Sequence, residues 1–185
     1  MALAVLAYLV HRDRGRLKGA VLAAVLGGAS RDEIAALTRA FVASTRTRRL
    51  RASALAAIER HRVAGDRLVL LSASPDLYVP ALGAELGFAE VICTEVRWQG
   101  SRLDGHLVSD NRRGEEKARV VTALLQRYPG PSSAYGNAAS DLLHLALVAR
   151  PLLVNGDATA RAKASALGIP TADWPCSPPR PSAKS

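Results

Sequence analysis

The sequence changes character near residue 67, and this change constrains the fold more than any other feature. Residues 1–64 contain only helix-like stretches rich in Ala, Leu and Val. From residue 67 onward, short apolar runs alternate with helical segments as far as residue 167. Alternating strands and helices favour a mostly parallel sheet with helices on both faces. We therefore expect an α/β fold with a doubly wound, mostly parallel sheet.

Turn and capping signals give the expected elements. Helices are expected at 17–26, from a capping box at Ser30 and Glu33 onward, and at 52–63. Four strands are then expected, at 67–72, 90–94, 132–136 and 152–154, with helices at 75–86, 114–128, 141–148 and 158–167. A hairpin should run through 96–98 and 106–108 with bends at Gly100 and Gly105. The Pro/Ser-rich segment 171–185 is expected to be a flexible tail.

Composition limits the partners. The net charge is +9, mostly from scattered arginines with one cluster at Arg46, Arg48, Arg49 and Arg51. No zinc-finger spacing or aromatic-rich strand accompanies it, so no specific nucleic-acid partner is expected. The simplest interpretation is a solvated basic helix face, with attraction to an anionic substrate or an acidic lipid surface as the alternative.

The apolar stretch Met1–Val10 does not resemble an export signal, because it has no basic residue before it and no cleavage site after it. It is also too short for a transmembrane segment. Cys93 and Cys176 fit neither a metal nor a disulfide spacing. A cytoplasmic protein is therefore expected, with peripheral membrane contact left open.

Polar residues follow three of the expected elements. Ser72-Ala73-Ser74 ends an apolar strand, and a hydroxyl beside free helix amides can bind a phosphoryl oxygen. Lys117 lies in the first turn of a helix, where a nearby anion would offset its unfavourable position. Asn137 and Asp141 follow the next strand and offer the oxygen ligands that Mg²⁺ prefers. The alternatives are an ordinary Ser/Pro turn, a surface lysine paired with Asp110 or Glu116, and a simple helix cap.

Taken together, these motifs resemble those of the haloacid dehalogenase (HAD) superfamily hydrolases, subclass IB, the phosphoserine-phosphatase-like branch. The similarity covers about residues 15 to 168 and includes Ser-Ala-Ser-Pro-Asp after one strand, Gly-Glu-Glu-Lys, and Leu-Leu-Val-Asn at 152–155. It implies a HAD/Rossmann-like core at residues 65–170 and a helical cap at 1–64.

The resemblance also implies roles for these residues. Ser72, Ala73 and Ser74 would bind phosphate, Lys117 would contact both phosphate and the catalytic nucleophile, and Asp141 with Asn137 would form the Mg²⁺ site. The family's nucleophile lies in an Asp-x-Asp-x-Thr motif after the first, central strand, and this sequence contains no such motif. We therefore expect the central strand to be missing and the chain to be inactive or weakly active, as an N-terminally truncated form whose natural product begins upstream of Met1.

Two functions remain open at this stage. The first is a Mg²⁺-dependent phosphomonoester hydrolase that acts on a small phosphorylated substrate, such as an amino-acid, sugar or lipid-linked phosphate. The second is a catalytically inactive pseudophosphatase that binds phosphate or a partner. The histidines His11, His61, His106 and His144 have no metal-pair spacing, so we expect them on the surface or in the packing.

Overall fold

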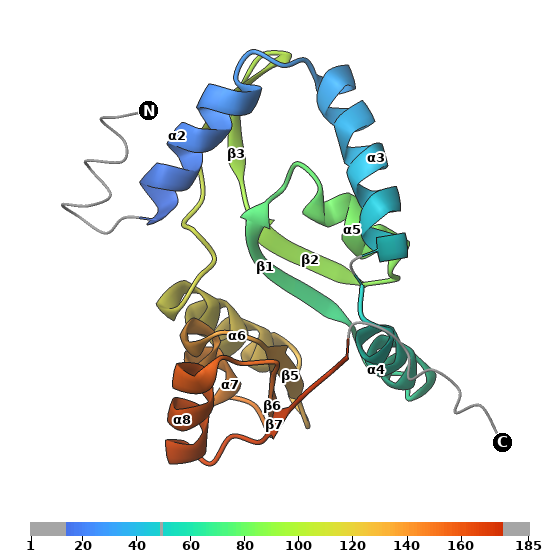
Figure 1. The fold of residues 1–185 in the computed structure, drawn as a ribbon, viewed down its shortest axis with the longest axis vertical. Helices are drawn as coiled ribbons and strands as arrows, with labels where there is room; N and C mark the ends of the chain where they lie inside the picture. The colour runs from blue at the N-terminus through green and yellow to red at the C-terminus, as the bar shows by residue number, and fades with distance from the viewer. Residues whose placement is uncertain (1–13, 49, 176–185) are drawn as a thin grey trace, which may run out of the picture. The chain divides into compact units, whose positions relative to one another are not determined.

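The computed structural model describes residues 14–48 and 50–175, which form two compact units (Figure 1). The first unit takes in the described residues of 1–49 and 61–112, and the second those of 50–60 and 113–185. Neither unit coincides with the expected cap at 1–64, so the division into cap and core stays a prediction. The stretch Met1–Val10 and the end of the expected tail lie outside the described residues.

Helices begin the first unit, and their ends follow the local signals. Helix α2 (Arg14–Leu26) stops before a glycine pair in which Gly28 has a φ of +82°. Helix α3 (Arg31–Arg48) begins with the predicted capping box. The Ser30 amide donates to Glu33 Oε2 at 2.8 Å, and the Glu33 amide donates to Ser30 Oγ at 3.3 Å. Helix α4 (Ala52–Val63), most of which belongs to the second unit, has the predicted bounds.

The parallel sheet of the first unit differs from the prediction at one end. Strand β1 (Val69–Pro75) pairs in parallel with β2 (Glu90–Thr94), and helix α5 (Val79–Glu85) connects them. The chain was expected to leave the strand at Ser72 and to enter a helix at Pro75, and both expectations are wrong. The register shifts between Leu71 and Pro75, and the Asp76 amide donates to the Thr94 carbonyl at 2.9 Å. This pairing with β2 delays the helix.

A hairpin packs against α2 and α3 in the same unit. Strands β3 (Val96–Gln99) and β4 (Arg102–Leu107) are antiparallel, and the buried side chains of Ile34, Val96 and Leu103 form one core cluster. Gly105 lies inside β4 rather than at the predicted bend. Its φ is +89°, and an added Cβ would lie 2.5 Å from the Ala23 backbone nitrogen. Helix α2 can therefore approach β4 only because this residue is glycine.

The second unit is a small α/β layer. It contains α6 (Glu115–Arg127), β5 (Ser133–Gly136), the 3₁₀ turn η1 (Ala139–Asp141), α7 (Leu142–Leu145), β6 (Arg150–Val154), α8 (Ala158–Ala166) and β7 (Thr171–Ala172). Its three strands are parallel in the order β5-β6-β7. The sequence did not predict β7, and the helix predicted at 141–148 is the shorter pair η1 and α7.

The core of the second unit is built from small and branched apolar side chains. Buried residues of α7, β6 and α8, with Ile169, form one cluster: Leu142, Leu145, Leu153, Ala160, Ala164 and Ile169. The parallel pairings of β1-β2 and β5-β6-β7 confirm the predicted α/β class. Within the described residues, β1 pairs only with β2 and β5 only with β6, and the missing central strand stays a prediction. None of the described helices is long and apolar enough to cross a membrane.

Candidate active site

A buried ion pair joins α6 to η1 in the second unit. Lys117 Nζ lies 2.8 Å from Asp141 Oδ1, and the two side chains are only 15% and 7% exposed. The alternative of a surface lysine paired with Asp110 or Glu116 is wrong, because the Lys117 side chain is only 15% exposed and pairs with Asp141. The structure thus brings together two of the residues that the motifs indicated.

The second carboxylate oxygen of Asp141 holds the end of β5. Asp141 Oδ2 accepts hydrogen bonds from the backbone amides of Asn137 at 3.0 Å and Ala138 at 3.1 Å. Gly136 is needed here, because an added Cβ would lie 2.6 Å from the Asp141 Cβ. The capping role considered as an alternative is therefore real, but the same carboxylate also holds the lysine.

The charges of this pair are set by opposing effects. Burial alone would raise the pKa of Asp141, but the hydrogen bond and charge of Lys117, with the Asn137 amide, outweigh it and lower the pKa. The carboxylate is therefore ionised at neutral pH. His144, one turn further, is 4% exposed, and burial together with the Lys117 charge lowers its pKa to about 4. It is a neutral packing histidine, and its Nδ1 has no hydrogen-bond partner among the described residues.

Ser72, Ala73 and Ser74 lie in the irregular end of β1, in the first unit, and all three are half-buried. Ser72 Oγ accepts a hydrogen bond from the Ser74 amide at 3.1 Å, which does not use the hydroxyl hydrogen. The free helix amides expected after Ser74 are not there, because α5 begins only at Val79. A phosphate site here would depend on the Ser72 hydroxyl and the turn itself.

A second lysine lies at this turn. Lys18, from α2, donates through Nζ to the Ala73 carbonyl and to Asn111 Oδ1. Thr94 Oγ1 donates to the same carbonyl at 3.0 Å. The sequence motifs do not include Lys18. The available signal is its spacing, because Lys18 is four residues before Leu22 and so lies on the apolar face of α2.

The hydrogen bonds of Asp141 leave it able to act as one metal ligand. No group of three or more His, Cys, Asp or Glu side chains that could hold a metal occurs in the described part of the chain. An ionised carboxylate has about four acceptor positions, and Asp141 uses three of them for Lys117, Asn137 and Ala138. Mg²⁺ is usually bound by one or two carboxylates, with waters and substrate phosphate completing its shell. Asp141 therefore fits as a single Mg²⁺ ligand, and the exposed residue Asn137 is adjacent to it.

Sequence comparisons place this chain among known hydrolases. A family model described as haloacid dehalogenase-like hydrolase matches residues 1–146. Protein CicA of Caulobacter vibrioides is 34% identical over 145 residues, which cover 78% of this chain and 65% of CicA. The chain thus spans less than two thirds of the length of that relative.

Solved structures show the same fold. A protein of unknown function from Bordetella pertussis Tohama I has a TM-score of 0.79 at 21% identity, covering 93% of this chain and 80% of that one. A HAD family hydrolase from Salmonella enterica serovar Typhi has a TM-score of 0.70 at 15% identity, covering 93% and 57%. A probable phosphoserine phosphatase from Vibrio cholerae has a TM-score of 0.69 at 15% identity, covering 86% and 48%.

Proposed function

Because this chain belongs to the haloacid dehalogenase-like hydrolase family, we propose that it binds phosphomonoesters, with Lys117 and Asp141 as the phosphate-binding residues of the second unit and the Ser72 turn as that of the first. The buried Lys117–Asp141 pair carries the proposal. A desolvated, ion-paired lysine at the start of a helix, beside the end of a parallel strand, is a cation placed for an anionic ligand.

The described residues support separate roles. Lys117 supplies positive charge to phosphoryl oxygens, and Asp141 fixes the ammonium at 2.8 Å. In the first unit, the Ser72 hydroxyl would donate a hydrogen bond to a phosphoryl oxygen. Asp141, with Asn137 beside it, would hold Mg²⁺, which when bound neutralises phosphate charge.

We also propose that hydrolysis by this 185-residue chain is slow or absent. The sequence contains no Asp-x-Asp-x-Thr motif. Asp141 does not replace the missing nucleophile, because three hydrogen bonds tie up its carboxylate. The site would then bind phosphate more readily than it cleaves a phosphate ester, and a pure binding role is the second candidate function.

Calorimetric titration of inorganic phosphate, with and without MgCl₂, tests the site. Lys117→Gln should weaken binding about 10- to 100-fold, the range expected when a hydrogen bond to a charged group is lost. Lys117→Arg, which keeps the charge, should retain part of the affinity. Thermal unfolding of each variant establishes that it is folded at the assay temperature.

Lys163→Gln is the matched control, because it removes the same charge from an exposed position of α8 in the same unit. It should change phosphate affinity less than about twofold. If both glutamine variants bind equally, the net charge of +9 attracts phosphate without a defined site, and the proposal fails. Hydrolysis of p-nitrophenyl phosphate, measured in parallel, separates the two functions: binding without turnover supports the pseudophosphatase.

A further inference from the structure

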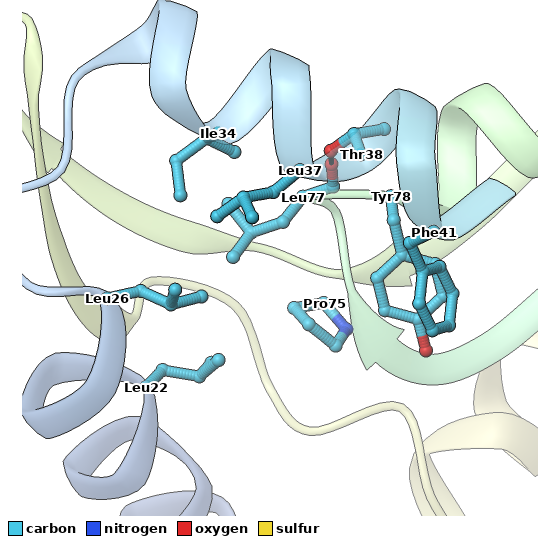
Figure 2. Close-up of a pocket in the computed structure, with 9 residues that line it drawn as sticks. All are labelled: Leu22, Leu26, Ile34, Leu37, Thr38, Phe41, Pro75, Leu77 and Tyr78. Carbon is cyan, nitrogen blue, oxygen red and sulfur yellow. Dashed lines mark hydrogen bonds between the residues drawn. The ribbon is translucent and has the colours of Figure 1, made fainter. Parts of the chain in front are cut away.

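The first unit contains an apolar pocket between α2, α3 and the turn that follows β1 (Figure 2). Its volume is about 150 Å³. Leu22 and Leu26 reach it from α2, Leu37 and Phe41 from α3, and Pro75 from the end of β1. A cavity of this size accommodates a benzene ring or a chain of about six carbons.

The side chains that line the pocket offer almost no hydrogen-bonding groups. Thr38 and Tyr78 are its only polar side chains, and no charged residue is among the residues that line it. Thr38 Oγ1 already donates to the Leu77 carbonyl at 2.6 Å. The Tyr78 ring packs on Phe41 with centroids 4.6 Å apart. The ammonium and carboxylate of phosphoserine, or the hydroxyls of a sugar, would lose their water here without compensation.

Two large side chains of the pocket remain open to solvent. Leu37 is 55% exposed and Phe41 is 37% exposed, although both lie on the face of α3 that carries the buried Ile34. Their exposure leaves apolar area that a ligand could cover.

The pocket lies next to positive charge. Lys18 is one helical turn before Leu22 on α2, and its ammonium contacts the Ala73 carbonyl. Pro75, which lines the pocket, directly follows Ser74. A cationic, hydroxyl-bearing turn thus continues into an apolar cavity within a single unit of the protein.

We infer that the substrate is an amphiphilic phosphomonoester, with its phosphate at the Ser72–Ser74 turn beside Lys18 and a hydrocarbon or aryl group of about six carbons in the pocket. This inference rests on the proposed phosphate-binding role of the Ser72 turn. Because the pocket is lined by apolar side chains, it favours an apolar phosphate over an amino-acid or sugar phosphate.

Calorimetric titration with methyl-, hexyl- and decylphosphonate in MgCl₂ tests the inference, because phosphonates bind without being hydrolysed. Each fully buried methylene gives about fourfold in affinity. Hexylphosphonate should therefore bind at least about 30-fold more tightly than methylphosphonate, and decylphosphonate should gain little more. O-phosphoserine should bind no more tightly than methylphosphonate.

Leu37→Asn and Leu167→Asn form a matched pair, because the two leucines are 55% and 56% exposed and only Leu37 lines the pocket. Leu37→Asn should lower hexylphosphonate affinity at least about fivefold and leave methylphosphonate affinity unchanged. Leu167→Asn should change neither affinity.

Other outcomes overturn the inference in distinguishable ways. Equal binding of methyl- and hexylphosphonate would refute the apolar substrate and leave the phosphate site intact. Tighter binding of O-phosphoserine than of hexylphosphonate would also refute the apolar substrate and leave the phosphate site intact. An affinity that keeps rising to decylphosphonate would indicate an open, lipid-binding surface rather than a bounded pocket. No binding of any phosphonate would refute the proposed phosphate site as well.

Discussion

Replacing Asp141 with asparagine tests how much the buried pair contributes to the second unit. The asparagine oxygen could still accept the Asn137 and Ala138 amides, which now bond to Asp141 Oδ2. Its NH₂ group would then face the Lys117 ammonium, whose nitrogen now lies 2.8 Å from Asp141 Oδ1. Two hydrogen-bond donors would then face each other, and a lysine that is only 15% exposed would lose its counter-ion.

The expected loss follows from these contacts. A hydrogen bond to a charged group contributes about 1.5–3 kcal/mol. Leaving one member of a buried pair uncompensated raises the cost to about 3–5 kcal/mol. Asp173→Asn is the control in the same unit, because the Asp173 side chain pairs with Arg161 while 74% exposed. Its cost should be about 0–1 kcal/mol.

Urea unfolding at pH 7, followed by tryptophan fluorescence, measures both losses. In a Trp98→Phe background the signal comes from Trp174, which packs on Tyr135 with centroids 5.5 Å apart in the second unit. The pKa of Asp141 is lowered in the folded state, so its stabilisation is complete above the unfolded pKa of about 3.9 and is lost as pH falls through the folded pKa. The difference between wild type and Asp141→Asn should therefore shrink below pH 4. A loss under about 1 kcal/mol at pH 7, or one equal to that of Asp173→Asn, would refute the reasoning.

Two further predictions concern other buried positions. The folded-state pKa of His144, about 4, lies below its usual value of 6.5. The stability of the protein should therefore be complete above pH 6.5 and fall by at most about 3 kcal/mol toward pH 4. In urea unfolding, His144→Leu should flatten this fall, and an unchanged slope of stability against pH would contradict the prediction. Gly105→Ala should cost about 2–4 kcal/mol, because the new Cβ would meet the Ala23 backbone at 2.5 Å. Gly100→Ala, at φ +60° in open space, should cost only about 1 kcal/mol, and equal thermal unfolding of the two variants would refute the difference.

Elements set by local chemistry could be predicted from the sequence. The capping box at Ser30 and Glu33 needs only a hydroxyl and a carboxylate three residues apart, and it forms as expected. Strand β2 and helix α4 have the predicted bounds, and a glycine with positive φ marks one end of each: Gly87 precedes β2 and Gly65 follows α4. The order of strands and helices also indicated the α/β class and the family.

Elements set by pairing could not be predicted in this way. Strand β1 continues past Ser72 because its backbone stays bonded to β2. The two-residue strand β7 exists only through its pairing with Leu153 and Val154 of β6. The helix expected at 141–148 ends already at Leu145, and the chain turns into β6 at Arg150, which pairs with Ser133 of β5. Each depends on a partner that local sequence does not reveal.

The same distinction between local and tertiary information applies to the candidate site. The sequence by itself determined which residue types carry the chemistry, because hydroxyls, a lysine, an amide and a carboxylate follow strands in a family-like order. Only the tertiary structure decided that Lys117 and Asp141, 24 residues apart, form a buried pair, and that Lys18 reaches the Ala73 carbonyl 55 residues away. Periodicity assigns a side chain to a face of its helix, but what that face meets depends on packing. For this reason Leu37 and Phe41, which share a helix face with the buried Ile34, line an open pocket.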